Sequence, residues 1–232
     1  MYQYSTARTN LISAAGTRFV WREAGAEHEG IPVVCFSYLM STMDDWDPAV
    51  IDGLACRFHV YLFDNRGVGR SEGQTPSSIE EMAEDAFHFL QAMGLSRIFL
   101  LGFSMGGMVA QAFTAAHPEM VEKLILVGTG PSGTVFRDSY TIPLKETTAK
   151  AILRHRDPKY YFLFESTPEG KKQATAFLER LRTRKKDRDM KIRLTSPVLK
   201  AQIQAIRSWF GSRSVDPSVI SCPVLIVVGE HD

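Results

Sequence analysis

The feature that most restricts the fold is a hexapeptide, GFSMGG (102–107), between a buried strand pattern and a helical pattern. The residues RIFLLGF (97–103) form a continuous apolar run, which is typical of a strand covered on both faces. Helical character begins at Met105 and extends to about Ala116. So tight a strand-to-helix turn has no room for side chains at Gly102 and Gly106, and it presents the Ser104 hydroxyl above the end of the sheet.

The alternation of strands and helices extends over the first 130 residues. Further strand patterns lie at 17–25, 31–37, 57–64 and 123–129, and a helical pattern with one apolar face covers 77–93. Ser78, with Glu81 three residues later, forms a capping box that marks the start of this helix. Strands that alternate with helices in this way predict the α/β fold class, with a mostly parallel sheet and helices on both faces.

After Gly130 the pattern changes to charged segments of helical character, and a strand pattern returns only at 223–228 (PVLIVV). We therefore expect a core at 1–130, a helical cap at 131–219 over the functional edge of the sheet, and a return to the core at 220–232. Between residues 171 and 193, ten Lys or Arg stand against three acids. Because the acids interrupt this run, we interpret it as a solvated helix surface rather than a docking face.

Composition excludes several classes of protein. The net charge of +1 argues against a general nucleic-acid binder, and no apolar run is long enough to predict a membrane span. The N-terminal MYQYSTARTN lacks the apolar core of a secretory signal, and the three cysteines are too scattered for a disulfide framework or a metal cluster. We therefore expect a cytoplasmic protein. No cofactor motif is present, so we expect no cofactor and no metal. Nothing in the sequence fixes the oligomeric state.

A second glycine-rich motif, DNRGVGRS (64–71), follows the strand pattern at 57–64. Its glycines permit a tight loop, and Asp64 and Arg66 can hold that loop by hydrogen bonds and charge. We interpret the motif as architecture. Asp64 precedes the serine and serves the loop, so it is not our candidate for a catalytic acid.

Four segments together resemble the α/β-hydrolase superfamily: FDNRGVGRS, LLGFSMGGMVAQ, AAHPEMVEKLILVG and PVLIVVGEHD. Within it they are similar to the cap-bearing hydrolases related to bacterial haloperoxidases and esterases. The resemblance covers 17–131 and 220–232 well and the cap loosely. It implies a serine hydrolase that acts on a small or medium acyl compound through an acyl-enzyme. It also implies Ser104 as nucleophile, Asp232 as the acid that orients a histidine, and the Met105 backbone N–H as an oxyanion donor.

The chain departs from the family in the loop after its third strand pattern. The family carries His-Gly there, and this chain reads FSYLMSTMDDW. An alignment from both ends of the loop places Ser37 and Tyr38 at the His-Gly positions and makes the Leu39 N–H the second oxyanion donor. A shift of one residue would make Tyr38 the donor. The Tyr38 hydroxyl is also a candidate to bind the oxyanion or the substrate, and packing under the cap is the alternative.

A second departure concerns the catalytic histidine, which in the family follows one further strand beyond the acid. None of the histidines present fits the position between acid and serine: His28, His59, His88, His117, His155 and His231. We therefore expect a C-terminally truncated hydrolase that lacks the family's final strand and helix and is nearly inactive. The apolar VLIVV would then lack a flanking strand. The alternatives are a non-catalytic protein that keeps the ligand pocket, and a lactonase, C–C bond hydrolase or perhydrolase of the same fold.

Overall fold

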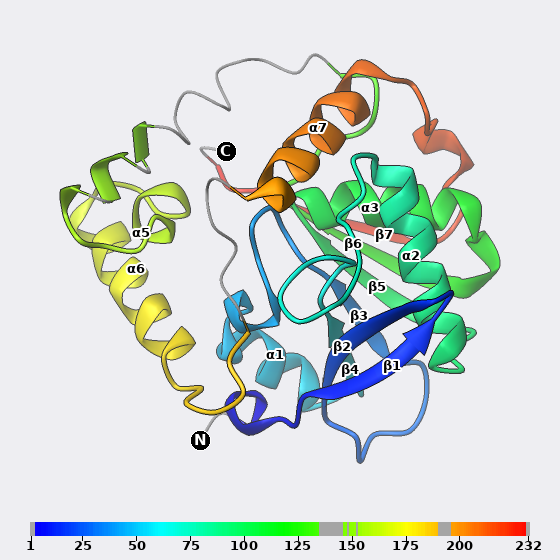
Figure 1. The fold of residues 1–232 in the computed structure, drawn as a ribbon, viewed down its shortest axis with the longest axis horizontal. Coiled ribbons are helices and arrows are strands. Elements are labelled where there is room, and N and C mark those ends of the chain that lie inside the picture. The colour runs from blue at the N-terminus through cyan, green and yellow to red at the C-terminus, as the bar shows by residue number, and fades with distance from the viewer. Residues whose placement is uncertain (1–2, 135–145, 148, 152, 190–195, 231–232) are drawn as a thin grey trace.

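A sheet of seven strands organises the computed structural model, which describes residues 3–134, 146–147, 149–151, 153–189 and 196–230. The strands lie in the order β1-β2-β4-β3-β5-β6-β7 (Figure 1). Their bounds are β1 (Asn10–Ala14), β2 (Thr17–Ala24), β3 (Val33–Phe36), β4 (Val60–Phe63), β5 (Ile98–Phe103), β6 (Val121–Val127) and β7 (Val224–Val227).

The predicted fold class is confirmed. Strands β4, β3, β5, β6 and β7 are parallel neighbours, while β1 and β2 add an antiparallel pair at one edge. The sequence analysis missed β1, whose side chains are mostly exposed or half-buried. The chain passes from β3 to β4 and then crosses to β5 on the other side of β3. Such a reversal of strand order is where open α/β sheets bind their ligands, at the carboxyl ends of the strands.

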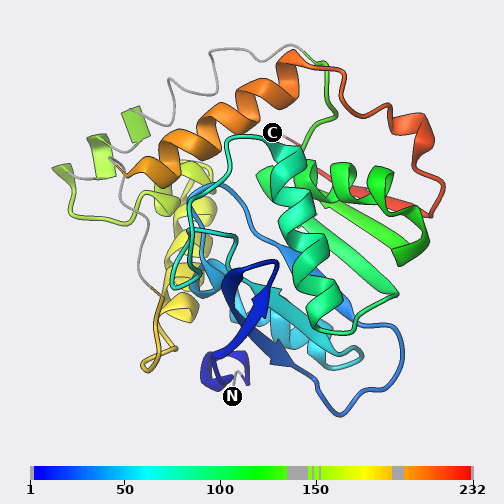
Figure 2. The ribbon, with the colours of Figure 1, turned by 45° about the vertical axis from the view of Figure 1, so that its right-hand side comes forward.

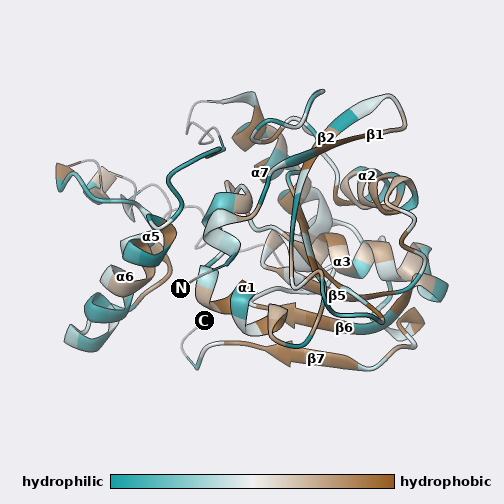
Figure 3. Ribbon diagram, turned by 90° about the horizontal axis from the view of Figure 1, so that it is seen from below, coloured by the Kyte–Doolittle hydropathy of each residue, from teal (hydrophilic) through white to brown (hydrophobic). Residues whose placement is uncertain are grey.

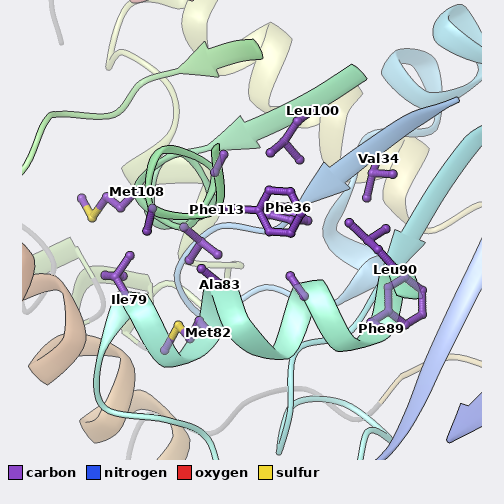
Figure 4. Close-up of a cluster of buried hydrophobic side chains, with 14 of the residues drawn as sticks. Val34, Phe36, Ile79, Met82, Ala83, Phe89, Leu90, Leu100, Met108 and Phe113 are labelled. Atoms are coloured by element: carbon purple, nitrogen blue, oxygen red, sulfur yellow. The ribbon is translucent and has the colours of Figure 1, made fainter. Parts of the chain in front are cut away.

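Helices cover both faces of the sheet because successive strand residues point to opposite sides. On one face, Val34 and Phe36 of β3 pack with α2 (Ile79–Ala92) and α3 (Met105–Ala116), as Figure 4 shows for the core around α2. On the other face, Val33 and Cys35 pack with α1 (Pro48–Ala55). The helix expected at 77–93 is therefore present as α2.

The helices described in full after β6 include α5 (Lys159–Phe162), α6 (Pro168–Leu181) and α7 (Pro197–Gly211). Helix α6 packs against α5 and contacts α1, and α7 contacts α2. Figure 2 shows α7, in orange, lying over the top of the sheet, and Figure 1 shows it apart from α5 and α6. The basic run at 171–193 is not wholly a solvated surface, because Arg180 pairs with Asp47 and the Arg184 side chain is buried against the N-terminal segment.

Among the strands that the structure describes, β7 is the outermost on its side of the sheet and pairs only with β6. Its residues Val224, Leu225, Ile226 and Val227 are between 42% and 64% exposed. Figure 3 shows β7 as an apolar strand along the edge of the molecule. An exposed apolar edge of this kind is a site at which other strands can pair.

Candidate active site

The Ser104 turn is strained and closely packed. Ser104 has φ +52° and ψ −116°, and it occupies the N-cap position of α3 without a side-chain capping bond. A Cβ on Gly102 would lie 2.5 Å from the Gly106 carbonyl oxygen, and one on Gly106 would lie 2.1 Å from the Phe36 carbonyl oxygen. Both contacts involve backbone atoms, so the predicted need for glycine at 102 and 106 is confirmed. Sequence analysis did not single out Gly107, where an added Cβ would lie 2.6 Å from the Thr129 Cγ2.

Neighbouring strands hold this turn at the carboxyl edge of the sheet. The Ser104 N–H donates to the Val127 carbonyl at 2.8 Å, and the Gly128 N–H donates to the Val227 carbonyl at 2.9 Å. The ends of β5, β6 and β7 are thus joined in one ladder. Residues that follow β7 therefore leave the sheet at the same edge as Ser104. Asp232, the expected acid, lies outside the described residues.

The loop after β3 lies against the serine turn, since the Phe36 and Ser37 carbonyls face Gly106. Tyr38 is buried, its ring packs on Phe103 with centroids 4.9 Å apart, and its hydroxyl donates to the Asp45 carbonyl at 3.1 Å. This arrangement corresponds to the packing alternative for Tyr38. The bond to Asp45 uses the hydroxyl's one proton, so the phenol does not donate to a substrate in this conformation.

The expected oxyanion donors, Leu39 and Met105, come from these two adjacent elements. Leu39 follows β3 and Met105 follows β5, and the two strands are paired up to Phe36 and Gly102. In the described part of the chain, neither backbone N–H has a hydrogen-bond partner. The next N–H in the loop, that of Met40, is already bound to the Gln202 Oε1 at 3.0 Å. The geometry is compatible with Leu39 and Met105 as a pair of donors, and Tyr38 stays the alternative to Leu39.

Three acids in the same loop hold the helical segment that follows β6. Asp45 pairs with Lys159 of α5 at 2.8 Å, and Asp47, the N-cap of α1, pairs with Arg180 of α6 at 2.6 Å. Asp44 accepts from the Asp189 N–H at 2.8 Å. The loop that would supply an oxyanion donor is therefore also the surface on which residues 157–189 are held.

Arg22 of β2 lies at the centre of a buried ionic network that ties the same segment to the core. Its side chain is 0% exposed and binds Asp44 at 2.7 Å and Asp189 at 2.8 Å, and its Nε donates to the Thr9 hydroxyl at 2.9 Å. Burial raises the pKa of the Asp189 carboxyl to about 6, against the lowering effect of Arg22. Sequence analysis missed Arg22, because its partner Asp189 is 167 residues away along the chain.

The DNRGVGRS loop is joined to this network through Asp64. Its carboxylate is buried and accepts from the Met43 N–H at 2.7 Å, while its backbone carbonyl accepts from the Ser71 hydroxyl. Burial, and then the charge of Asp189, hold the pKa of Asp64 well above its usual range. Arg66 binds Asp85 of α2 at 2.8 Å. Asp64 therefore has a structural role in fixing the loop that follows β3.

The family model described as the alpha/beta hydrolase fold matches residues 31–232. The chain belongs to the α/β-hydrolase family. An alpha/beta hydrolase fold protein from Chitinophaga pinensis superposes with a TM-score of 0.85 at 35% identity, over 96% of this chain and 79% of that one. The predicted superfamily is thereby confirmed.

Curated relatives of this α/β-hydrolase match over shorter stretches. "Putative carbamate hydrolase RutD" from Serratia proteamaculans is 32% identical over 89 residues, which are 38% of this chain and 33% of that protein. Pimeloyl-[acyl-carrier protein] methyl ester esterase from Edwardsiella ictaluri is 36% identical over 86 residues, or 37% of this chain and 32% of that protein. The aligned part thus spans about a third of the length of these relatives.

Three of the described histidines, His59, His88 and His117, lie away from Ser104. His59 precedes β4, at the opposite edge of the sheet, and pairs with Glu23 at 2.7 Å. His117 ends α3, thirteen residues and about 20 Å from the serine, and stacks on Phe87. His88, on α2, pairs with Glu84. Within the described ranges, no histidine forms a hydrogen bond with Ser104.

Among the described residues, no group of three or more His, Cys, Asp or Glu side chains is arranged to hold a metal ion. None of the described helices is both long enough and apolar enough to cross a bilayer.

Proposed function

We propose that the protein is a serine hydrolase of carboxylic esters or related acyl compounds, with Ser104 as its nucleophile. The observation that carries the proposal is the backbone of Ser104, a non-glycine residue at φ +52° in a turn closed by glycine contacts. Strain of this kind costs on the order of 1–3 kcal/mol and is concentrated at functional sites. Here it presents a hydroxyl at the N-terminus of α3, where helix N–H groups favour negative charge.

In the proposed reaction, the Ser104 Oγ attacks the acyl carbonyl carbon while a base removes the hydroxyl proton. The N–H groups of Met105 and Leu39 stabilise the oxyanion, with Tyr38 as the alternative to Leu39. Collapse of the intermediate expels the alcohol, which takes the proton back from the base, and water then hydrolyses the acyl-enzyme. Asp232 would orient the base, a histidine that the described residues do not place beside Ser104.

The names of two relatives support an acyl substrate. One name refers to a carbamate and the other to a methyl ester, and both compounds have a carbonyl bonded to a heteroatom. The sequence of the proposed cap at 131–219 contains several aromatic residues, such as Tyr160, Phe164 and Trp209, which favours a small or medium acyl compound. C–C bond hydrolysis, lactone hydrolysis and perhydrolysis use the same nucleophile and are alternatives. A cytoplasmic location belongs to the same proposal.

A rival proposal from another class is a non-catalytic protein that binds an acyl compound without cleaving it. The observation in its favour is that no described histidine lies at Ser104. Against it stands the strained turn, which a protein that only binds its ligand does not require.

The two proposals differ in how ester hydrolysis responds to added imidazole. A positioned general base contributes about 10²–10⁴-fold, and a base free in solution recovers only part of this. We expect imidazole to raise p-nitrophenyl butyrate hydrolysis about tenfold above the rate of Ser104→Ala under the same conditions. The variant is the matched control because imidazole alone also cleaves this ester. Equal imidazole-dependent rates in the two proteins would favour the non-catalytic binder.

A further inference from the structure

Helix α7 connects the two loops that flank the Ser104 turn. Gln202 accepts a hydrogen bond from the Met40 N–H, in the loop after β3, at 3.0 Å. Trp209, two turns later, donates from its indole to the Gly130 carbonyl, in the loop after β6, at 3.1 Å. Strands β3 and β6 are the neighbours of β5 on its two sides. The helix therefore crosses the end of β5, where Ser104 lies, consistent with its position over the sheet in Figure 2.

One face of α7 is buried along this crossing. Its buried residues are Leu199, Gln202, Ala205 and Trp209, a spacing that places them on one side of a helix. Gln202 is 0% exposed, and it is the only residue of this buried face with an amide side chain. A buried amide within an apolar stripe calls for a reason beyond helix packing.

The Met40 N–H determines how the Gln202 amide is oriented. Two donors cannot share a hydrogen bond, so the atom that faces this N–H must be the carbonyl oxygen Oε1. The amide nitrogen Nε2 is then directed elsewhere. It is buried and has no hydrogen-bond partner among the described residues. A buried donor without an acceptor loses its hydration and gains nothing in return.

The carbonyl oxygen of the Gln202 amide has a structural role, which is to support the loop after β3. Met40 has φ +61°, a conformation rare for a residue with a side chain, and the bond to Oε1 holds it there. Leu39, the expected oxyanion donor, directly precedes Met40. Only Oε1 supports the loop in this way, and the donor Nε2 does not contribute to it.

We propose that Gln202 determines the substrate specificity of the Ser104 site. Its Nε2 donates to an acceptor oxygen that the acyl compound carries in addition to the carbonyl attacked by Ser104. The preferred substrates are then oxygenated acyl groups, such as alkoxy or oxo acids, rather than plain alkanoates. This inference rests on the proposed function, because it takes the acyl group of that reaction as the ligand.

The test follows the Gln202 side-chain amide directly by ¹H–¹⁵N NMR of the Ser104→Ala chain, in which esters bind without turnover. Gln202→Leu in the same background assigns the signal by its loss. The probes are two matched ester pairs, ethyl methoxyacetate with ethyl butyrate and ethyl 3-methoxypropionate with ethyl pentanoate. Each pair replaces one methylene by oxygen, at two different distances from the carbonyl. We expect at least one ether ester to shift the Nε2 protons downfield, and neither plain ester to do so.

Binding affinities provide the second readout. We expect the preferred ether ester to bind about tenfold more tightly than its methylene partner, as one hydrogen bond provides, and this preference to vanish in Gln202→Leu. Gln202→Glu is the matched variant, because it keeps an acceptor for the Met40 N–H and removes the donor. We expect Gln202→Glu to lose the preference for the ether ester, as Gln202→Leu does. The backbone amide signal of Met40 should stay unchanged in Gln202→Glu.

Two outcomes would contradict a role of Gln202 in substrate specificity. Absence of a Gln202 shift with both ether esters, or an equal preference in Gln202→Leu, would overturn the specificity role. Failure of the proposed function has a separate signature, in which ether esters shift the Gln202 signal but Ser104 shows no reactivity. The protein would then be a binder of oxygenated esters.

Discussion

Arg22→Met should lower the free energy of unfolding at pH 8 by about 3–5 kcal/mol, measured by urea denaturation. The side chains of Arg22 and Asp189 are 0% exposed and that of Asp44 is 7% exposed. Removal of the guanidinium therefore leaves the buried Asp189 carboxylate without its paired cation, whereas Asp44 keeps Arg184 and Arg188, each at 3.5 Å. Methionine keeps most of the side-chain volume, so the loss reports charge rather than a cavity.

The loss should be smaller at pH 5.5 than at pH 8. Burial raises the folded-state pKa of Asp189 to about 6, so the folded state binds more protons than the unfolded state between roughly pH 4 and pH 6. The contribution of this group to stability therefore falls as the pH rises through that window. Without Arg22 the pKa of Asp189 should rise further, and acidification should protonate the carboxyl and recover part of the lost stability.

The control is the double variant Arg22→Met/Asp189→Asn, which also removes the stranded charge of Asp189. It should be more stable at pH 8 than Arg22→Met alone and depend less on pH. A loss below about 1 kcal/mol for Arg22→Met at both pH values would contradict the network as the structure shows it.

Gly106→Ala should separate the serine turn from the loop after β3. The new methyl group would lie 2.1 Å from the Phe36 carbonyl oxygen and 2.7 Å from that of Ser37, and backbone atoms cannot rotate away. Overpacking of this kind costs about 1–3 kcal/mol of stability. Since a displacement of about 1 Å can cost 10²-fold in rate, we expect a loss of roughly that size in the imidazole-dependent, Ser104-dependent ester hydrolysis.

Gly53→Ala is the matched control for this substitution. Gly53 lies in α1, and a Cβ there would meet no atom within 4 Å. Alanine should therefore leave hydrolysis unchanged and stabilise the helix by about 0.5–1 kcal/mol. Full Ser104-dependent hydrolysis by Gly106→Ala would show that the contact between loop and turn has no catalytic importance.

The parts of the fold that could be predicted from sequence depend on local pattern. Strands β3, β4, β5, β6 and β7 are continuous apolar runs, and the Ser104 turn has glycines wherever backbones approach closely. Strand β1 could not be found in this way, because it is a hairpin edge with Leu11 60% exposed and no continuous apolar run.

The contacts that set the loop after β3 could not be predicted, because they join residues far apart in the chain. Met40 and Gln202 are 162 residues apart, and Asp47 and Arg180 are 133 apart. Charge counts alone suggested a solvated surface around Arg180. Gln202 did leave a usable signal, since it is a polar residue within a stripe of buried positions on α7.

Reaction of Ser104 with a fluorophosphonate tests the central claim most directly, since this reagent forms a bond only with an activated hydroxyl at such a site. The chain would be treated with the reagent in the presence of imidazole, digested with trypsin and mapped by mass spectrometry. We predict a phosphonyl group on Ser104, within the peptide 98–123, and none on the corresponding peptide of Ser104→Ala. An unmodified Ser104, or modification at another serine alone, would contradict the assignment of Ser104 as the nucleophile.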